Sequence, residues 1–338
     1  MKSKAMERQS SSRIFLFDNL KFLLMTLVVV GHFANAFIVS SDYYQSIFLF
    51  IYAFHMPLFL FLAGLFHNNK DIFPKVLSYL VLGFMLKIVL FLTELILDRE
   101  APAFSLLSDY YVPWYMFTLA FYLSLSYVLR NIDKKFILFF SIFLACFAGY
   151  DASIGDYLYL SRSIVFYPYF VLGEMLSKED ISRINRVSWL KLFSIVILVI
   201  WAGGCCLKLK DMYIFRPLFI GRSNFVEIDI FKNWGFVYRF LCYVIALLTG
   251  GAIICLVPNR EIPMITKFGA RTLQIYFWHP VIEMILLKLE VGTYLYNAHW
   301  GEFLWICCAI LITFVLSLKP FGFPTTTVMK ACQYKQNE

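Results

Sequence analysis

The 338-residue chain has few charged residues, since Asp, Glu, Lys and Arg make up only 15% of it. A typical soluble protein carries about 25%. Apolar residue types make up 61% of the chain and aromatic residues 19%, so a soluble fold would lack polar residues to cover its surface. The scarcity of charge excludes an ordinary soluble enzyme, a disordered chain and a nucleic-acid-binding protein with an exposed basic face. It leaves an integral membrane protein whose surroundings are a lipid bilayer, with no nucleic acid among its partners.

The sequence also lacks paired cysteines. Its eight Cys residues form no Cys-x-x-Cys pair and no Cys/His cluster, so neither a zinc site nor a disulfide framework is expected. We interpret them as small apolar side chains in helices. No cleavable signal peptide is expected either, because the mostly polar residues 1–13 precede an apolar run long enough to stay in the membrane.

Long apolar runs predict an all-α, polytopic membrane bundle of about ten transmembrane helices, because a span needs about 20 apolar residues. The predicted spans are 14–39, 46–66, 73–97, 112–130, 135–152, 158–177, 189–206, 234–257, 264–290 and 300–318. The span 135–152 is short and 264–290 carries several polar groups, so nine or eleven spans also remain open. The transmembrane domain is expected over 14–318, between an N-terminal segment 1–13 and a C-terminal tail 319–338.

Orientation follows from Lys and Arg, which concentrate in cytoplasmic loops. Most of them fall in alternate breaks if both termini are cytoplasmic. The exception is the long outer break 207–233, which holds Lys208, Lys210, Arg216, Arg222 and Lys232. That loop is either a weak point of the predicted topology or a functional element.

Ionisable groups inside the predicted spans are functional candidates, because a charge at mid-bilayer costs about 3 to more than 10 kcal/mol. They are Asp18, Lys21, His32, His55, Lys87, Glu94, Arg162, Glu174, Arg239, Arg271, His279 and Glu283. Pairing inside the bundle, or snorkelling to an interface, is the competing interpretation for Lys87, Glu94 and Arg239. Glu283 follows His279 by four residues on one helical face, which also permits a structural pair.

The first span aligns two of these groups. Lys21 and His32 are separated by about 1100°, which is roughly 20° beyond three full turns, and by roughly 16.5 Å along the axis. Lys21 then lies near the cytoplasmic mouth and His32 deep in the membrane on the same face. This geometry suits a ligand with an anionic head and a long arm, such as acyl-coenzyme A. Lys21 meets a phosphate, and a neutral His32 serves as general base.

Two further histidines lie beside prolines. His55 precedes Pro57 in the second span and His279 precedes Pro280 in the ninth, and a proline kink beside an imidazole can open a cavity. Hydrogen bonding to a neighbouring helix is the alternative for His55. No ligand spacing supports a metal site made of these histidines. Arg162, near the outer end of the sixth span, either binds an acceptor sugar or anion from outside or snorkels to lipid phosphate.

Together these motifs resemble the acyltransferase-3 family of integral membrane O-acyltransferases, in its fucose 4-O-acetylase-like branch. The family's opening Asp-x-x-Arg, with a His after ten intervening residues, matches Asp18-Asn19-Leu20-Lys21 and His32. The stretch from Phe54-His55-Met56-Pro57 to Gly64 resembles its second helix. The later blocks match Pro113-Trp114-Tyr115, Arg162 through Phe170-Val171-Leu172-Gly173, and Ile275-Tyr276-Phe277-Trp278-His279-Pro280.

The resemblance implies transfer of an acyl group, usually acetyl, from cytoplasmic acyl-coenzyme A to a hydroxyl of a glycan or lipid-linked glycan. Lys21 and His32 then belong to the donor site. Two departures concern donor binding. Lys21 replaces the family's Arg, which removes a bidentate phosphate contact, and an Arg-x-x-Arg motif after the second helix is replaced by His67-Asn68-Asn69-Lys70 and Lys75.

We therefore predict a multi-pass O-acetyltransferase of a bacterial inner membrane that acts on a surface-polysaccharide precursor. Its donor substrate is acetyl-coenzyme A and it holds no bound cofactor. The predicted catalytic residues are His32 and Asp18, of which Asp18 orders the entrance. Lys21, with Lys70 or Lys75, binds donor phosphates. The predicted acceptor-binding residues are His55, Trp114, Arg162, Tyr276 and His279, with Trp114 and Tyr276 stacking on sugar rings.

Two rival interpretations remain. A secondary transporter or glycan flippase also fits ten spans with polar groups at mid-membrane, although neither an inverted repeat nor paired broken helices are apparent. Another superfamily of membrane O-acyltransferases uses a single buried His. In that case His279 is essential and Lys21 dispensable.

Overall fold

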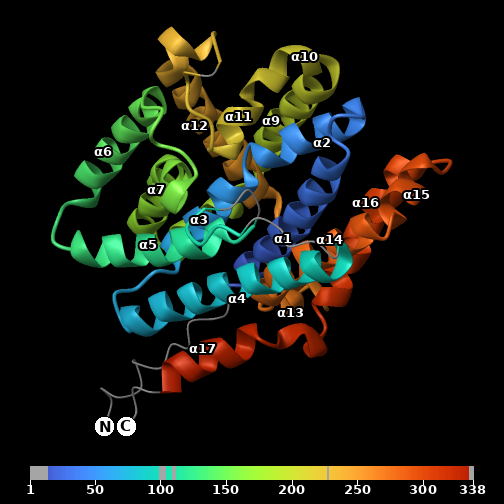
Figure 1. The fold of residues 1–338 in the computed structure, drawn as a ribbon. Coiled ribbons are helices and arrows are strands. Elements are labelled where there is room, and N and C mark those ends of the chain that lie inside the picture. The colour runs from blue at the N-terminus through green and yellow to red at the C-terminus, as the bar shows by residue number, and fades with distance from the viewer. Residues whose placement is uncertain (1–13, 99–103, 109–111, 227, 335–338) are drawn as a thin grey trace.

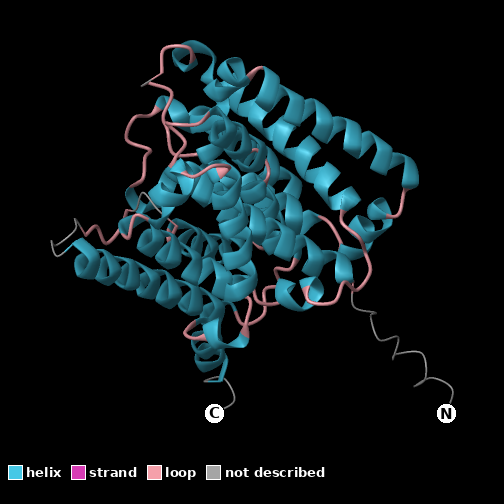
Figure 2. Cartoon of the chain, turned by 90° about the vertical axis from the view of Figure 1, so that its right-hand side faces the viewer, coloured by secondary structure: helices cyan, strands magenta, loops and turns pink. Residues whose placement is uncertain are grey.

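The computed structural model describes residues 14–98, 104–108, 112–226 and 228–334. Within them the chain forms α-helices and short 3₁₀ turns and no strand (Figure 2). The predicted all-α bundle is confirmed. The predicted N-terminal segment 1–13 lies outside the described residues.

Helices occupy all ten predicted spans (Figure 1). They are α1 (Phe15–Ala36), α2 (Asp42–Tyr52) with α3 (His55–Leu65), α4 (Ile72–Asp98), α5 (Trp114–Val128), α6 (Lys134–Phe147), α7 (Leu160–Met175), α9 (Ser188–Leu207), α12 (Phe231–Leu256), α13 (Ile265–Gly269) with α14 (Thr272–Lys288), and α16 (Gly301–Leu316). Two predicted spans are thus interrupted. In the second span, Pro57 has no N–H for the carbonyl of Ala53 and its ring crowds that carbonyl, so α2 stops there and α3 starts afresh.

Five of these helices are long and apolar enough to cross a membrane by length and composition. They are α1, the α2–α3 pair, α4, α9 and α12. The others are shorter, and α16 is one such apolar helix. The chain has membrane-capable helices, while the number of spans and the side on which the termini lie stay predictions.

The connecting segments gather at two ends of the bundle. At one end the Asn19 amide donates to the carbonyls of Pro258 and Arg260, at 2.8 and 2.9 Å, and the Asn259 amide donates to Ser182. We call this the inner end, because the Lys/Arg pattern predicts that it faces the cytoplasm.

Other segments meet at the opposite, outer end. The Tyr296 hydroxyl donates to the Ser40 carbonyl at 3.1 Å, and the Ser46 hydroxyl donates to the Cys205 carbonyl at 3.0 Å. The connections after α1, α9 and α14 thus meet at the outer end, and those after α7 and α12 meet at the inner end. Short helices complete them: α8 (Lys178–Asn185) at the inner end and α15 (Val291–Asn297) at the outer end.

The loop expected over 207–233 is largely folded. It contains α10 (Leu209–Met212), η3 (Tyr213–Phe215) and α11 (Arg216–Ile220), which contact α2, α9 and α12 (Figure 1). Phe225 is completely buried, and a Cβ at Gly235 would collide with its ring. Residues 207–226 thus form an outer cap with its own contribution to the core.

The predicted tail also contains structure. The 3₁₀ turn η4 (Lys319–Gly322) leads into the helix α17 (Thr325–Tyr334). Two other 3₁₀ turns, η1 (Ala148–Tyr150) and η2 (Tyr157–Tyr159), lie between α6 and α7. Helix α17 packs against α4 (Figure 1). The sequence prediction gave this tail no secondary structure.

Helices α3 and α7 touch backbone to backbone through two glycines. A Cβ on Gly64 would lie 2.9 Å from the carbonyl carbon of Phe170 and closer still to its oxygen. A Cβ on Gly173 would lie 2.8 Å from the amide nitrogen of Leu65. Small residues allow this close approach. Inside a membrane, van der Waals packing of this kind stabilises helix association, because lipid supplies no hydrophobic driving force. The glycine pair fixes α3, which lines the site, relative to α7, which carries Arg162.

Candidate active site

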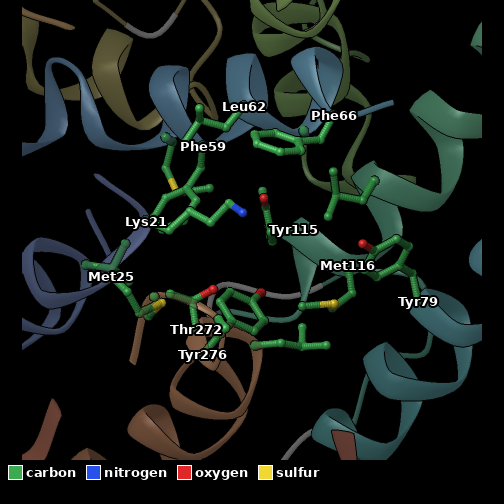
Figure 3. Close-up of a pocket in the computed structure, with 17 residues that line it drawn as sticks. Lys21, Met25, Phe59, Leu62, Phe66, Tyr79, Tyr115, Met116, Thr272 and Tyr276 are labelled. Carbon is green, nitrogen blue, oxygen red and sulfur yellow. The ribbon is translucent and has the colours of Figure 1, made fainter. Parts of the chain in front are cut away.

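A cavity of about 320 Å³ opens between α1, α3, α4, α5 and α14. It is lined mainly by apolar and aromatic side chains, with the Lys21 amine pointing into it between Phe59 and Phe66 on one side and Tyr276 on the other (Figure 3). Small-molecule sites typically have this character, an apolar concavity with few polar groups. Its size suits one arm of a ligand rather than a whole nucleotide conjugate.

The cavity follows two helices toward the middle of the bundle. On α1 its wall includes Lys21 and then Val28, and the next position on that face is His32. On α14 its wall includes Thr272 and then Tyr276, and His279 lies one turn further on. Residues three or four apart share a helix face, so both walls point to the two histidines.

The imidazole rings of His32 and His279 lie with their centroids 5.2 Å apart. His279 is completely buried, while His32 keeps part of its surface accessible. Sequence reasoning assigned them to the donor and acceptor sides separately. The tertiary structure brings them together beyond the deep end of the cavity.

The tautomer of His279 follows from its hydrogen bonds. Its Nδ1 lies 3.1 Å from the Ile275 carbonyl oxygen, which can only accept, so Nδ1 carries the proton. In a neutral ring Nε2 is then the unprotonated nitrogen. This Nε2 is buried and has no hydrogen-bond partner among the described residues. His279 therefore holds a buried, unprotonated nitrogen next to His32.

The inner mouth of the cavity carries positive charge. The Lys21 ammonium lies 3.9 Å from a carboxylate oxygen of Asp18 and 4.3 Å from the centroid of the Phe66 ring. The Lys178 ammonium lies 4.2 Å from the centroid of the same ring. Lys178 was not among the predicted donor residues. Its position in the chain, at the start of a short amphipathic helix, gives no sign that it would meet Phe66.

Asn19 positions this mouth. In addition to its bonds to the 258–260 segment, its side-chain oxygen accepts from the Thr266 hydroxyl at 2.7 Å. Gly269 allows α13 to touch the α1 backbone at Asp18, where a Cβ would collide with the Asp18 carbonyl. The beginning of α1 is thereby fixed, and with it the side chain of Lys21. Sequence reasoning missed Asn19, although it is a polar residue inside a predicted span.

Lys70 and Lys75, the other predicted donor residues, lie in and after the turn that follows α3. The Lys75 ammonium donates to the Asn68 side chain and to the Lys70 carbonyl, both at 2.7 Å. Neither lysine lines the cavity. Lys21 and Lys178 are the cations that the structure places on the Phe66 ring at the mouth.

Arg162 and Trp114, both predicted for the acceptor, lie toward the outer end, and His55, the third, begins α3. The Arg162 guanidinium is 4.8 Å from the Trp114 ring centroid, and Trp114 stacks on Phe166. His55 donates from Nδ1 to the Ile51 carbonyl at 2.9 Å, and its ring lies 4.5 Å from that of Tyr52.

Tyr276, also predicted for the acceptor, lines the Lys21 cavity instead. Its hydroxyl donates to the Val112 carbonyl and its ring lies 5.4 Å from that of Tyr115. Tyr276 therefore sits between the cavity and the histidine pair.

A second polar cluster lies at the inner end, away from this cavity. Glu174 accepts from the Lys134 ammonium at 2.7 Å and from the Ser126 hydroxyl, and lies 3.7 Å from Nε2 of His67. Burial holds the pKa of His67 below its usual range, against the opposing attraction of Glu174. This cluster ties together the inner ends of α5, α6 and α7, and we regard it as structural.

No group of three or more His, Cys, Asp or Glu side chains within the described ranges is arranged to hold a metal ion. The family model described as an acyltransferase domain matches residues 15–318. No curated protein and no solved structure matches the chain. The match covers nine-tenths of the sequence, so the chain belongs to the acyltransferase-3 family and is a membrane acyltransferase.

Proposed function

We propose that this acyltransferase moves an acetyl group from acetyl-coenzyme A to a hydroxyl of a surface-polysaccharide or lipid-linked glycan precursor in a bacterial inner membrane. The observation that carries the proposal is an alignment of the cavity with the histidine pair along α1 and α14. A cavity begins at Lys21 at the inner end, and its two walls lead to the paired rings of His32 and His279.

The donor enters from the inner end. Its phosphates meet Lys21 and Lys178, which act as point charges at the mouth, and its acyl-carrying arm follows the apolar cavity past Tyr276. The 320 Å³ volume holds the arm. The charged head stays in water, so its charges need not be desolvated. The thioester then reaches the histidine pair.

The acceptor hydroxyl approaches the same pair from the outer end. One imidazole takes the hydroxyl proton as the oxygen attacks the thioester carbonyl, and the carbon–sulfur bond then breaks to release coenzyme A as the thiol. His32 is the proposed base because it aligns with Lys21 on one face of α1. His279, with its unprotonated Nε2 beside His32, accepts a hydrogen bond or the proton itself.

The test is transfer of radiolabelled acetyl from acetyl-coenzyme A to lipid-linked glycan in membranes that contain the protein. His32→Ala is expected to lose at least roughly a hundredfold in transfer. His299→Ala, an exposed residue at the outer end, is the matched control and keeps full activity. Transfer by His32→Ala at the control rate removes His32 from the mechanism.

Two further substitutions separate the proposal from its rivals. If His279→Ala is inactive while Lys21→Ala is fully active, the chain uses a single buried histidine and the donor path proposed here is wrong. Uptake of glycan into proteoliposomes without any acyl donor would instead favour a transporter.

A further inference from the structure

Three arginines near the outer end of the bundle, Arg162, Arg216 and Arg239, have guanidinium nitrogens without hydrogen-bond partners among the described residues. Arg239 is held by a bond from its Nη1 to the Leu218 carbonyl at 2.7 Å. Arg162, at the outer end of α7, is 7% exposed, and neither its Nε nor its Nη1 has a hydrogen-bond partner among the described residues. The buried Nε of Arg216, in the outer cap, likewise has none. A buried charge without hydrogen bonds is costly to fold, and inside a membrane it marks a functional site by default.

Arg162 and Arg216 converge on one place, next to the histidine pair. The Arg216 guanidinium lies 5.2 Å from the Phe48 ring centroid, and Phe48 stacks on Tyr52 at 3.5 Å. The charges of Arg162 and Arg216 both act on the Tyr52 hydroxyl. Tyr52 in turn packs against Gly31, the neighbour of His32, since a Cβ there would lie 3.0 Å from its ring.

Positive charge is in excess around Tyr52. The charge of Glu283, which is buried, also acts on the Tyr52 hydroxyl, so one carboxylate faces two guanidiniums. The charges of Arg222 and Asp156 also act on Arg162, in opposite senses, and these two groups are paired with each other, because the Arg222 Nε donates to both Asp156 carboxylate oxygens at 2.8 and 2.9 Å. Among the charges that act on Tyr52, the two guanidiniums thus outnumber the one carboxylate by one.

We propose that Arg162 and Arg216 bind an oxyanion of the acceptor, so that the preferred acceptor is an acidic glycan. A guanidinium presents a planar fork of donors that matches a carboxylate or phosphate. One surplus charge fits a single carboxylate, as in a uronic acid residue. This assignment rests on the proposed function, because it names the acceptor class of that site.

The experiment measures acceptor binding without any acyl donor. The full chain, purified in detergent, is titrated with p-nitrophenyl β-glucuronide, with the neutral p-nitrophenyl β-glucoside, and with glucose 6-phosphate, and ligand-induced thermal shifts give each Kd. We expect the glucuronide to bind at least roughly tenfold more tightly than the glucoside, the magnitude of a charge-assisted hydrogen bond. Tighter binding of glucose 6-phosphate would support the same site with phosphate as the anion. Equal affinity for all three probes overturns the proposal.

The variants are Arg162→Gln and Arg216→Gln, with Arg183→Gln as the matched control because the Arg183 side chain is 79% exposed at the inner end. Each of the first two is expected to lose the preference for the acidic probe, and the control is expected to keep it. If Arg162→Gln does not fold, Arg162→Lys and Arg216→Gln carry the test, since lysine keeps the charge and loses the fork. A preference that survives in all folded variants refutes the assignment.

The outcome is independent of the catalytic proposal. If the two arginine variants lose the acidic preference and His32→Ala stays active, the anion site is supported and His32 is not the base. Efficient acetylation of a neutral lipid-linked glycan, with no acidic preference in binding, would keep the acyltransferase mechanism and refute the anion site alone.

Discussion

The contact between α3 and α7 gives the sharpest test of how packing supports the site. In Gly64→Ala the new methyl carbon would lie 2.9 Å from the Phe170 carbonyl carbon, whereas non-bonded carbons pack at about 3.5–4.0 Å. The helices must therefore separate by roughly 1 Å. No rotamer change relieves the clash, because the obstacle is backbone.

The expected cost is about 3 kcal/mol, the upper end for overpacking. The unfolding entropy grows with chain length, at about 2.1 cal/mol/K per residue, so a chain of 338 residues loses roughly 1.4 °C of melting temperature per kcal/mol and we expect a fall of roughly 4 °C in detergent. Activity should fall further than stability suggests. Helix α3 lines the cavity and α7 carries Arg162, and a 1 Å misplacement costs on the order of a hundredfold in rate.

Gly203→Ala is the matched control, since a Cβ there meets nothing within 4 Å. Alanine in a helix interior is favoured over glycine by up to about 1 kcal/mol, so this variant should melt at or above the temperature of the unmutated protein. Thermal unfolding and acyl-transfer rate are measured on both. If Gly64→Ala melts and reacts like Gly203→Ala, close glycine packing does not hold the site together.

Three other outcomes are expected. Lys21→Ala should raise the KM for acetyl-coenzyme A roughly 10- to 100-fold with little change in kcat, because the phosphate contact is the same in ground and transition states. Lys21→Arg should restore the low KM. Initial rates that show a change in kcat alone would contradict a role of Lys21 in phosphate binding. Arg162→Gln should melt at or above the temperature of the unmutated protein, since it removes an uncompensated buried charge; a loss of several degrees would make Arg162 structural. The melting temperature should fall as the pH drops below about 6.5, because the pKa of His67 is lower in the folded than in the unfolded protein and the unfolded chain then binds more protons. Above that pH the stabilisation from His67 is fully present. His67→Gln should flatten the dependence of melting temperature on pH, and an unchanged dependence would assign the loss in acid to other groups.

The sequence by itself determined the membrane class and the helical architecture. Apolar runs broken by charged segments are a strong, local signal, because lipid requires each spanning backbone to satisfy its own hydrogen bonds. The alignment of Lys21 with His32 was also predictable, since both lie on one helix and helical geometry fixes their relative direction. The family match over residues 15–318 agrees with the resemblance that these motifs carried.

The break between α2 and α3 and the folding of the outer cap were harder to predict. Pro57 signals a kink, but not where the chain restarts. Residues 207–226 carry many charges and read as a loop, and yet Phe225 fills a space that Gly149 and Gly235 leave open. Such contacts join positions far apart in sequence, so no local pattern announces them.

Only the tertiary structure decided which polar groups meet. His32 and His279 are nearly 250 residues apart, and their 5.2 Å approach depends on how α1 packs against α14. Lys178 joins Lys21 at Phe66, while Lys70 and Lys75 lie elsewhere, although all four looked alike as basic residues near the inner end. Charge and periodicity determine where a residue sits along its own helix, and helix packing determines what it faces.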